Sequence, residues 1–152
     1  MAQATDTSSG MALAHRYRVT NLWWATGATV VLVLAHLLSP NPAGYGTHTA
    51  VLPIPCPWRA ITHLPCPSCG MTTAFAWMAR GRLAQAFRCN PLGPVAYWLT
   101  WGILLWSLVA AARGKGGPGA ALARPHVLTV VIVLYLGVWI VRLVFLFLGH
   151  GT

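Results

Sequence analysis

Residues 126–148 read HVLTVVIVLYLGVWIVRLVFLFL, and this stretch decides the fold class. It is apolar almost throughout, and Arg142 is its only side chain with a permanent charge. At about 1.5 Å per residue, a helix of this length crosses the roughly 30 Å hydrocarbon core of a bilayer with some tilt. We therefore predict a transmembrane helix over residues 126–148.

Two more apolar runs lie upstream of this helix. The run at 22–38 would reach about 25 Å as a helix, near the lower limit for a span, and the run at 92–112 is longer. No small-x-small site follows the first run, which disfavours a cleaved signal peptide. The sequence thus predicts an all-α membrane protein. A disordered cytoplasmic tail at 1–15 precedes a single membrane domain at 16–152, with three spans at 22–38, 92–112 and 126–148.

The composition agrees with a membrane location and excludes several functions. Hydrophobic residues make up 57% of the 152-residue chain and charged residues only 7%, against about 25% in soluble domains. Asp6 is the only acidic residue, so there are no paired carboxylates for glycoside hydrolysis and no intramembrane acid for a proton relay. The ten basic residues flank apolar runs and do not gather on one polar face, so we expect lipid headgroups as partners and no nucleic acid.

Residues 39–91 separate the first two predicted spans. The part at 39–65 is rich in Pro and Gly and predicts an ordered loop outside the hydrocarbon. Two short helices are predicted next, interfacial or re-entrant, at 67–79 and 82–89. Cys66 and Pro67 would cap and begin the first of them, and Asn90 and Pro91 would begin the helix at 92–112.

The positive-inside rule does not decide between three and four spans. With three spans and a cytoplasmic N-terminus, five basic residues face the cytoplasm and four face outward, and a further crossing at 61–79 gives the same score. We prefer three spans, because the apolar helix after Gly70 has only about ten residues, roughly half of a bilayer. We expect a multi-pass protein of the cell membrane, with four transmembrane helices as the alternative.

Residues 56–70 read CPWRAITHLPCPSCG, which contains Cys-x9-Cys-x2-Cys-Gly. This segment and its continuation resemble a family of small bacterial membrane proteins, domain-of-unknown-function family 2752. The resemblance covers about residues 56–92, and His63 and Thr73 depart from the family pattern, which has Gly and Arg there. It implies a membrane protein of unknown activity and supplies no reaction. The matching residues are Cys56, Trp58, Arg59, Thr62, Pro65, Cys66, Pro67, Cys69, Gly70, Thr72, Ala74, Gly81, Ala86, Asn90 and Pro91.

Three interpretations of the cysteines are open. The first is a zinc site, in which Cys56, Cys66 and Cys69 supply three ligands and His63 or Cys89 the fourth. The second is a redox pair, in which the helix dipole activates Cys66 and Cys69 resolves the mixed disulfide. The third, which we favour, is one or two structural disulfides that staple the loop.

The favoured function is accordingly non-enzymatic: a membrane component that presents a disulfide-stabilised, extracytoplasmic cysteine loop to a membrane-protein partner or to a second copy. No cofactor is expected in that case, and zinc is the alternative. We expect Thr72 and Thr73 to bond back to helix carbonyls, and the alternative is that they line a groove beside Cys69. Arg142 is expected to snorkel to the interface or, if buried, to bind a backbone carbonyl, a lipid phosphate or another protein.

Overall fold

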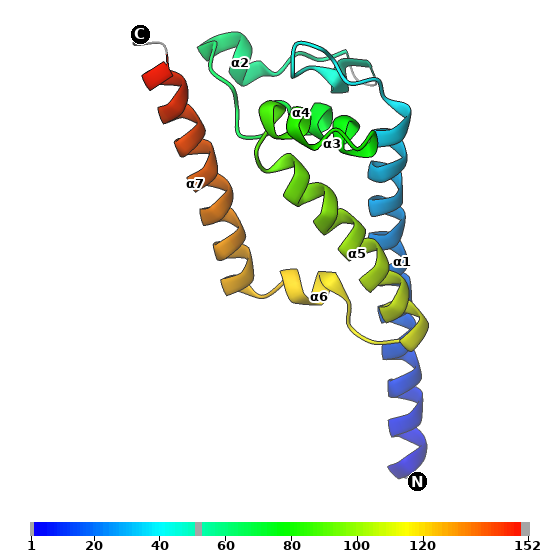
Figure 1. Ribbon diagram of the computed structural model, residues 1–152. Coiled ribbons are helices and arrows are strands. Elements are labelled where there is room, and N and C mark those ends of the chain that lie inside the picture. Colours follow the sequence, from blue (N-terminus) through cyan, green and yellow to red (C-terminus); the bar gives the residue numbers. More distant parts are fainter. Residues whose placement is uncertain (1, 51–52, 150–152) are drawn as a thin grey trace. The chain divides into compact units, whose positions relative to one another are not determined.

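The computed structural model of the protein describes residues 2–50 and 53–149 (Figure 1). All regular structure in these two ranges is helical, without any strand, which confirms the predicted all-α class. The helices are α1 (Ala2–Leu37), the 3₁₀ helix η1 (Thr47–Ala50), α2 (Pro57–Thr62), α3 (Met71–Ala79), α4 (Leu83–Cys89), α5 (Gly93–Arg113), α6 (Pro118–Leu122) and α7 (Pro125–Gly149).

Three helices are long and apolar enough to cross a membrane. The qualifying segments are Gly10–Leu37, Gly93–Arg113 and Pro125–Phe145. Within the described ranges no fourth helix qualifies, because α3 and α4 have nine and seven residues. The described ranges therefore contain three candidate spans, the number preferred from the sequence.

The first helix differs from its prediction at the N-terminal side. α1 begins at Ala2, whereas the sequence predicted a disordered tail at 1–15. Residues 2–15 contain no proline and only one glycine, Gly10, and their alanines, methionine and leucine favour helix. The polar composition that suggested disorder is thus compatible with a helical extension of the first span.

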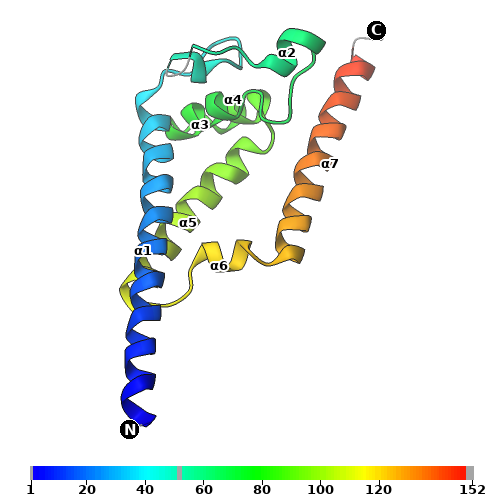
Figure 2. The ribbon, with the colours of Figure 1, turned by 180° about the vertical axis from the view of Figure 1, so that it is seen from behind.

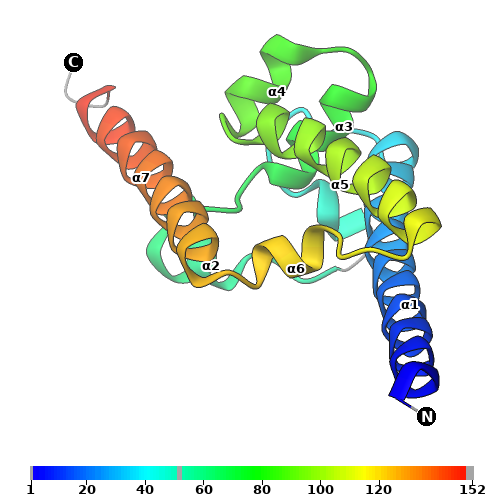
Figure 3. The same cartoon turned by 90° about the horizontal axis from the view of Figure 1, so that it is seen from below.

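The described residues form two compact units, where the sequence predicted one domain. The first unit contains the chain up to Val31 together with Leu99–Leu128. Its connector includes α6, which begins with Pro118 at a first-turn position and is the short yellow helix in Figure 3. Asn21 is 2% exposed, and its side-chain N–H donates to the carbonyl of Lys115 at 2.9 Å, which ties this connector to α1.

The second unit contains Leu32–Trp98 and the chain from Thr129 onward, and it holds all four cysteines. Its centre is the pair α3 and α4, which lie side by side in Figures 1 and 2. Ala74, Ala76 and Ala86 are fully buried there, because small side chains let the two helices approach closely. A methyl group at Gly93 would overlap Ala74, so glycine is needed where α5 begins.

The first of the two short helices begins later than the sequence predicted. α3 begins at Met71 and is preceded by Gly70 at φ 83°, so Cys66 and Pro67 do not cap or begin it. Residues 67–70 instead form consecutive turns, in which the N–H of Cys69 donates to the carbonyl of Cys66 and that of Met71 to Ser68, both at 3.0 Å. The predicted helix at 82–89 corresponds to α4.

The loop region differs from its prediction at two further points. Residues 39–65 are not helix-free, because they contain η1 and α2. The predicted start at Asn90 and Pro91 becomes a turn, and α5 begins at Gly93. Asn90 still accepts a hydrogen bond at its side-chain oxygen, from the N–H of Leu92 at 3.0 Å, as a capping residue does.

Candidate functional site

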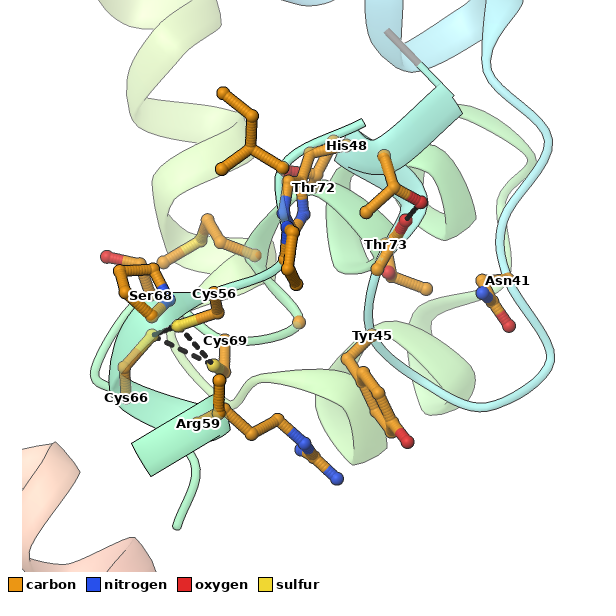
Figure 4. A pocket seen from close by; sticks show the side chains of 18 residues that line it. Asn41, Tyr45, His48, Cys56, Arg59, Cys66, Ser68, Cys69, Thr72 and Thr73 are labelled. Carbon is orange, nitrogen blue, oxygen red and sulfur yellow. Dashed lines mark hydrogen bonds between the residues drawn. The ribbon is translucent and has the colours of Figure 1, made fainter. Parts of the chain in front are cut away.

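Three of the four cysteines meet in the second unit (Figure 4). The sulfur of Cys66 lies 2.8 Å from that of Cys69, and the sulfur of Cys56 lies 3.5 Å from Cys66 and 3.7 Å from Cys69. Cys56 is the N-cap of α2, while Cys66 and Cys69 bracket the turn before α3. All four cysteines are free thiols, so the disulfide predicted as a staple is not present in the structure.

Local backbone chemistry brings the three thiols together. Pro57 occupies the first turn of α2, where its missing N–H costs nothing. The helix then ends at His63, which adopts a left-handed conformation with φ 58° and donates its N–H to the carbonyl of Arg59 at 3.0 Å. This reversal returns the chain, so that Cys66 comes back beside Cys56.

One face of α7 holds the cysteine turn. The hydroxyl of Tyr135 is 2.6 Å from that of Ser68, and the indole N–H of Trp139 donates to the carbonyl of Pro65 at 3.0 Å. The Trp139 ring also meets the Trp58 ring edge to face, with centroids 6.1 Å apart. Residues 135, 139 and 142 follow helical spacing, so they lie on the same side of α7.

Arg142 makes the third of these contacts. Its guanidinium donates one hydrogen bond to the carbonyl of Cys69 and another to the carbonyl of Cys89, each at 2.9 Å. The favoured expectation of snorkelling is therefore wrong, and the backbone-carbonyl alternative is confirmed. Because Cys89 ends α4, its carbonyl belongs to the negative end of that helix, which suits a cation.

Two further motif residues fix the backbone between the cysteines. Asn90 is 2% exposed and donates its side-chain N–H groups to the carbonyls of Pro67 at 3.1 Å and Cys69 at 3.2 Å. Gly70 packs so closely that a Cβ there would lie 2.5 Å from the carbonyl oxygen of Cys89 and 2.9 Å from that of Gly44. Both residues therefore stabilise the backbone conformation of the cysteine turn.

The remaining predicted site residues do not belong to the group of three sulfurs. His63 is exposed at the end of α2, and Cys89 is buried in α4. Neither lies with the three sulfurs, so within the described residues the group has no fourth protein ligand. Thr72 and Thr73 both line the cavity beside Cys69, as the alternative expectation for them stated. Pro91 is exposed in the turn before α5. The hydroxyl of Thr73 bonds that of Thr47 at 2.8 Å, which connects α3 to η1.

The three thiols differ in acidity. The backbone N–H of Arg59, in the first turn of α2, faces the Cys56 sulfur and lowers the pKa of this thiol, although it forms no capping bond of standard geometry. Burial, followed by hydrogen bonding with Cys69 and Cys56, raises the pKa of Cys66 to about 12. The predicted activation of Cys66 by a helix N-terminus therefore lacks its physical cause, since no helix begins there.

This difference predicts the order of alkylation. In metal-free protein at pH 8, we expect Cys56 to react with iodoacetamide before Cys66, because only the thiolate is nucleophilic and the Cys56 thiolate forms at lower pH. Peptide mass spectrometry over a pH series would measure both rates. Faster modification of Cys66 at every pH would contradict the assignment.

A cavity of about 920 Å³ adjoins the sulfurs. The three cysteines form part of its wall, and the rest comes from α2, from η1 and the loops on either side of it, and from the turn and the start of α3 that follow Cys66. Figure 4 shows Arg59 reaching from beside the cysteines toward Tyr45. The guanidinium carbon of Arg59 lies 3.6 Å from the centre of the Tyr45 ring, a cation–π contact.

The helices and the thiol group define a class of protein: an all-helical, membrane-type protein with three candidate spans and a cluster of three cysteines. The comparisons add one family match over part of the chain. Residues 56–104 match the family model described as "Protein of unknown function (DUF2752)", which confirms the resemblance found in the cysteine motif. No curated protein and no solved structure matches the chain.

Proposed function

We propose that this protein is a membrane protein that binds one thiophilic metal ion, of which zinc is the commonest, through Cys56, Cys66 and Cys69. The sulfur separations of 3.5 and 3.7 Å support the proposal. In a tetrahedral site with Zn–S bonds near 2.3 Å, sulfurs lie about 3.8 Å apart. The pair Cys66 and Cys69, at 2.8 Å, would have to open by about 1 Å to complete such a triangle.

The surroundings favour an ion with one exchangeable position. Structural zinc sites are closed by four protein ligands, whereas sites that act on a ligand keep three and leave the fourth open. Here the cavity of about 920 Å³ lies beside the three sulfurs and gives access to that position. Three thiolates around a divalent ion leave one negative charge, and Arg142 interacts electrostatically with Cys66 and Cys69.

We also propose a cellular location and an orientation in the membrane for the protein. We place the protein in the plasma membrane with its N-terminus in the cytoplasm and the cysteine group on the outer side. Five basic residues then face the cytoplasm and four face outward, and no nucleic acid is expected as a partner. The lipid bilayer surrounds the three apolar helices. A membrane-protein partner, or a second copy of the chain, would deliver or receive the ion at the open position.

Metal content tests the proposal directly. We expect protein purified in detergent to retain about one zinc ion per chain, and serine at position 56, 66 or 69 to reduce retention about tenfold or more, because each ligand is lost. Cys89→Ser is the matched control: it removes a buried thiol outside the group and should keep the metal. Equal metal content in Cys89→Ser and Cys69→Ser would refute the site, as would a wild-type chain that holds no ion after zinc loading.

The second candidate is thiol–disulfide exchange, which the 2.8 Å separation of the Cys66 and Cys69 sulfurs favours. In this reaction the two thiols would reduce a disulfide of a partner protein to two thiols and would become joined themselves. Cys56, with its lowered pKa, would attack the partner's disulfide in place of Cys66 and release the first partner thiol. Cys66, 3.5 Å away, would then displace the second partner thiol and form a Cys56–Cys66 disulfide. Cys69 would attack Cys66 in turn, which leaves Cys66 and Cys69 joined and returns Cys56 as a thiol. A Cys66–Cys69 disulfide found in protein from cells, together with zinc-free protein, would select this candidate.

A further inference from the structure

We infer that the cavity beside the cysteines is a binding site for an anionic amphiphile, in which Arg59 binds the anionic head and the apolar wall holds the chain. The inference goes beyond the metal site, because Arg59 and the wall do not depend on a bound ion. The two sites share one cavity, so a ligand held by Arg59 lies next to the open position proposed for the metal.

The position of the Arg59 charge is the first support. Arg59 is half-buried on α2, and its guanidinium is stacked on the Tyr45 ring at 3.6 Å. Stacking fixes the plane of the guanidinium and leaves its N–H groups at the edge available for hydrogen bonds. A planar fork of donors, held in place before binding, matches the paired oxygens of a phosphate or carboxylate.

The second support is the lack of an internal counter-charge. From residue 7 to the end of the sequence there is no Asp or Glu, so no acidic side chain near Arg59 in sequence or in the second unit neutralises it. Arg142 differs, because two backbone carbonyls accept its hydrogen bonds. A half-buried cation at a cavity wall without an acidic partner favours an external anion.

The third support is the chemistry of the remaining wall. Apolar side chains gather around the cavity, and Ile54 is 64% exposed although it is large and apolar. Besides Arg59 and the cysteines, the wall carries polar side chains, none of which is a carboxylate: Asn41, Tyr45, His48, Thr49, Ser68, Thr72 and Thr73. A free inorganic anion would leave the apolar part uncovered, whereas a chain attached to the anion would bury it. The apolar lining residues are Ile54, Pro55, Pro57, Ala60 and Met71.

Calorimetric titration of the full-length protein in a neutral detergent tests this inference. The probes are dihexanoyl phosphatidate, which has an anionic head and short chains, dihexanoyl phosphatidylcholine, which has the same chains and no net charge, and inorganic phosphate. We expect phosphatidate to bind at least about tenfold more tightly than either of the others. Equal affinity for inorganic phosphate and phosphatidate would show that the chains do not bind and would overturn the amphiphile as the ligand. Equal affinity for both lipids would show that the anionic head is not recognised and would overturn the anion site.

Variants connect binding to Arg59. Arg59→Gln should weaken phosphatidate binding about tenfold or more, because a charge-assisted hydrogen bond is lost. Arg82→Gln, which removes the same charge from an exposed position outside the cavity, should leave it unchanged. Arg59→Lys keeps the charge without the planar fork and should retain part of the affinity, which guards against a folding defect in the glutamine variant. Unchanged affinity in Arg59→Gln would overturn the inference.

The same samples separate this inference from the metal proposal. Arg59→Gln should retain zinc, since its side chain is not a ligand. Protein that binds phosphatidate but no zinc would remove the metal site and keep the anion site. Protein that holds zinc but binds no phosphatidate would remove the anion site alone.

Discussion

Gly70→Ala is expected to destabilise the cysteine unit by about 3 kcal/mol or more. Position 70 has φ 83°, which costs roughly 1–2 kcal/mol for a residue with a Cβ. In addition, the new methyl carbon would lie 2.5 Å from the carbonyl oxygen of Cys89 and 2.9 Å from that of Gly44. Both are backbone atoms, so relief requires movement of the chain, which adds the cost of overpacking. Thermal unfolding in detergent would measure the loss, and alkylation of Cys69 would report its exposure.

Gly81→Ala is the matched control for this prediction. Gly81 also has a left-handed backbone, with φ 69°, but no atom lies within 4 Å of the Cβ position. Its variant should therefore show the conformational strain alone, roughly 1–2 kcal/mol, and should leave Cys69 protected. If the two variants unfolded at the same temperature, close packing around Gly70 would not contribute, and the geometry proposed for the turn would be wrong.

The membrane helices were predictable because their signal is carried by composition over many residues. A helix in lipid satisfies its own backbone, so an apolar stretch of sufficient length is enough to identify it. Residues 126–148 illustrate this, since their span corresponds to α7 within a few residues at each end. The cysteine group was predictable in part: the spacing indicated Cys56, Cys66 and Cys69 together, and they meet.

What the sequence could not supply are contacts that depend on local backbone reversals. α2 has only six residues, the first of which is Pro57, too few for a periodic pattern. Its end relies on a left-handed conformation at His63 that a non-glycine residue seldom adopts. For the same reason the turn at residues 67–70 was mistaken for helix. His63, predicted as a possible ligand, is instead exposed at the end of α2 and does not belong to the group of three.

The polar face of α7 did leave a signal in the sequence. Tyr135, Trp139 and Arg142 are spaced by four and three residues within an apolar helix, which is the spacing of one helix face. Considered singly, Arg142 was compatible with snorkelling. Considered together, three hydrogen-bonding side chains on one face indicate a polar partner, and the structure identifies it as the backbone around the cysteines.

Arg142→Met is expected to have the other large effect, a loss of roughly 3 kcal/mol in stability together with weakened zinc retention. Methionine keeps the length and the apolar character suited to a span but removes the donors to the carbonyls of Cys69 and Cys89. The Cys89 carbonyl would be left without this donor, which costs about 1–3 kcal/mol, whereas the Cys69 carbonyl still accepts from Asn90 and loses one hydrogen bond, about 1 kcal/mol. The proposed metal group would also lose the nearby positive charge that offsets its thiolates. Thermal unfolding and metal analysis would measure the two effects.

Two further variants separate the hydrogen bonds from the charge. Arg142→Lys keeps the charge but not the planar fork that reaches both carbonyls, so it should recover zinc retention more fully than stability. Arg124→Met removes one arginine from the exposed connector and should change neither quantity, which excludes a general effect of net charge. If Arg142→Met matched wild type in both measurements, α7 would not hold the cysteine turn. If Arg142→Lys restored stability completely, positive charge alone would account for the contact, because an ammonium group lacks the geometry to serve two carbonyls as a guanidinium does.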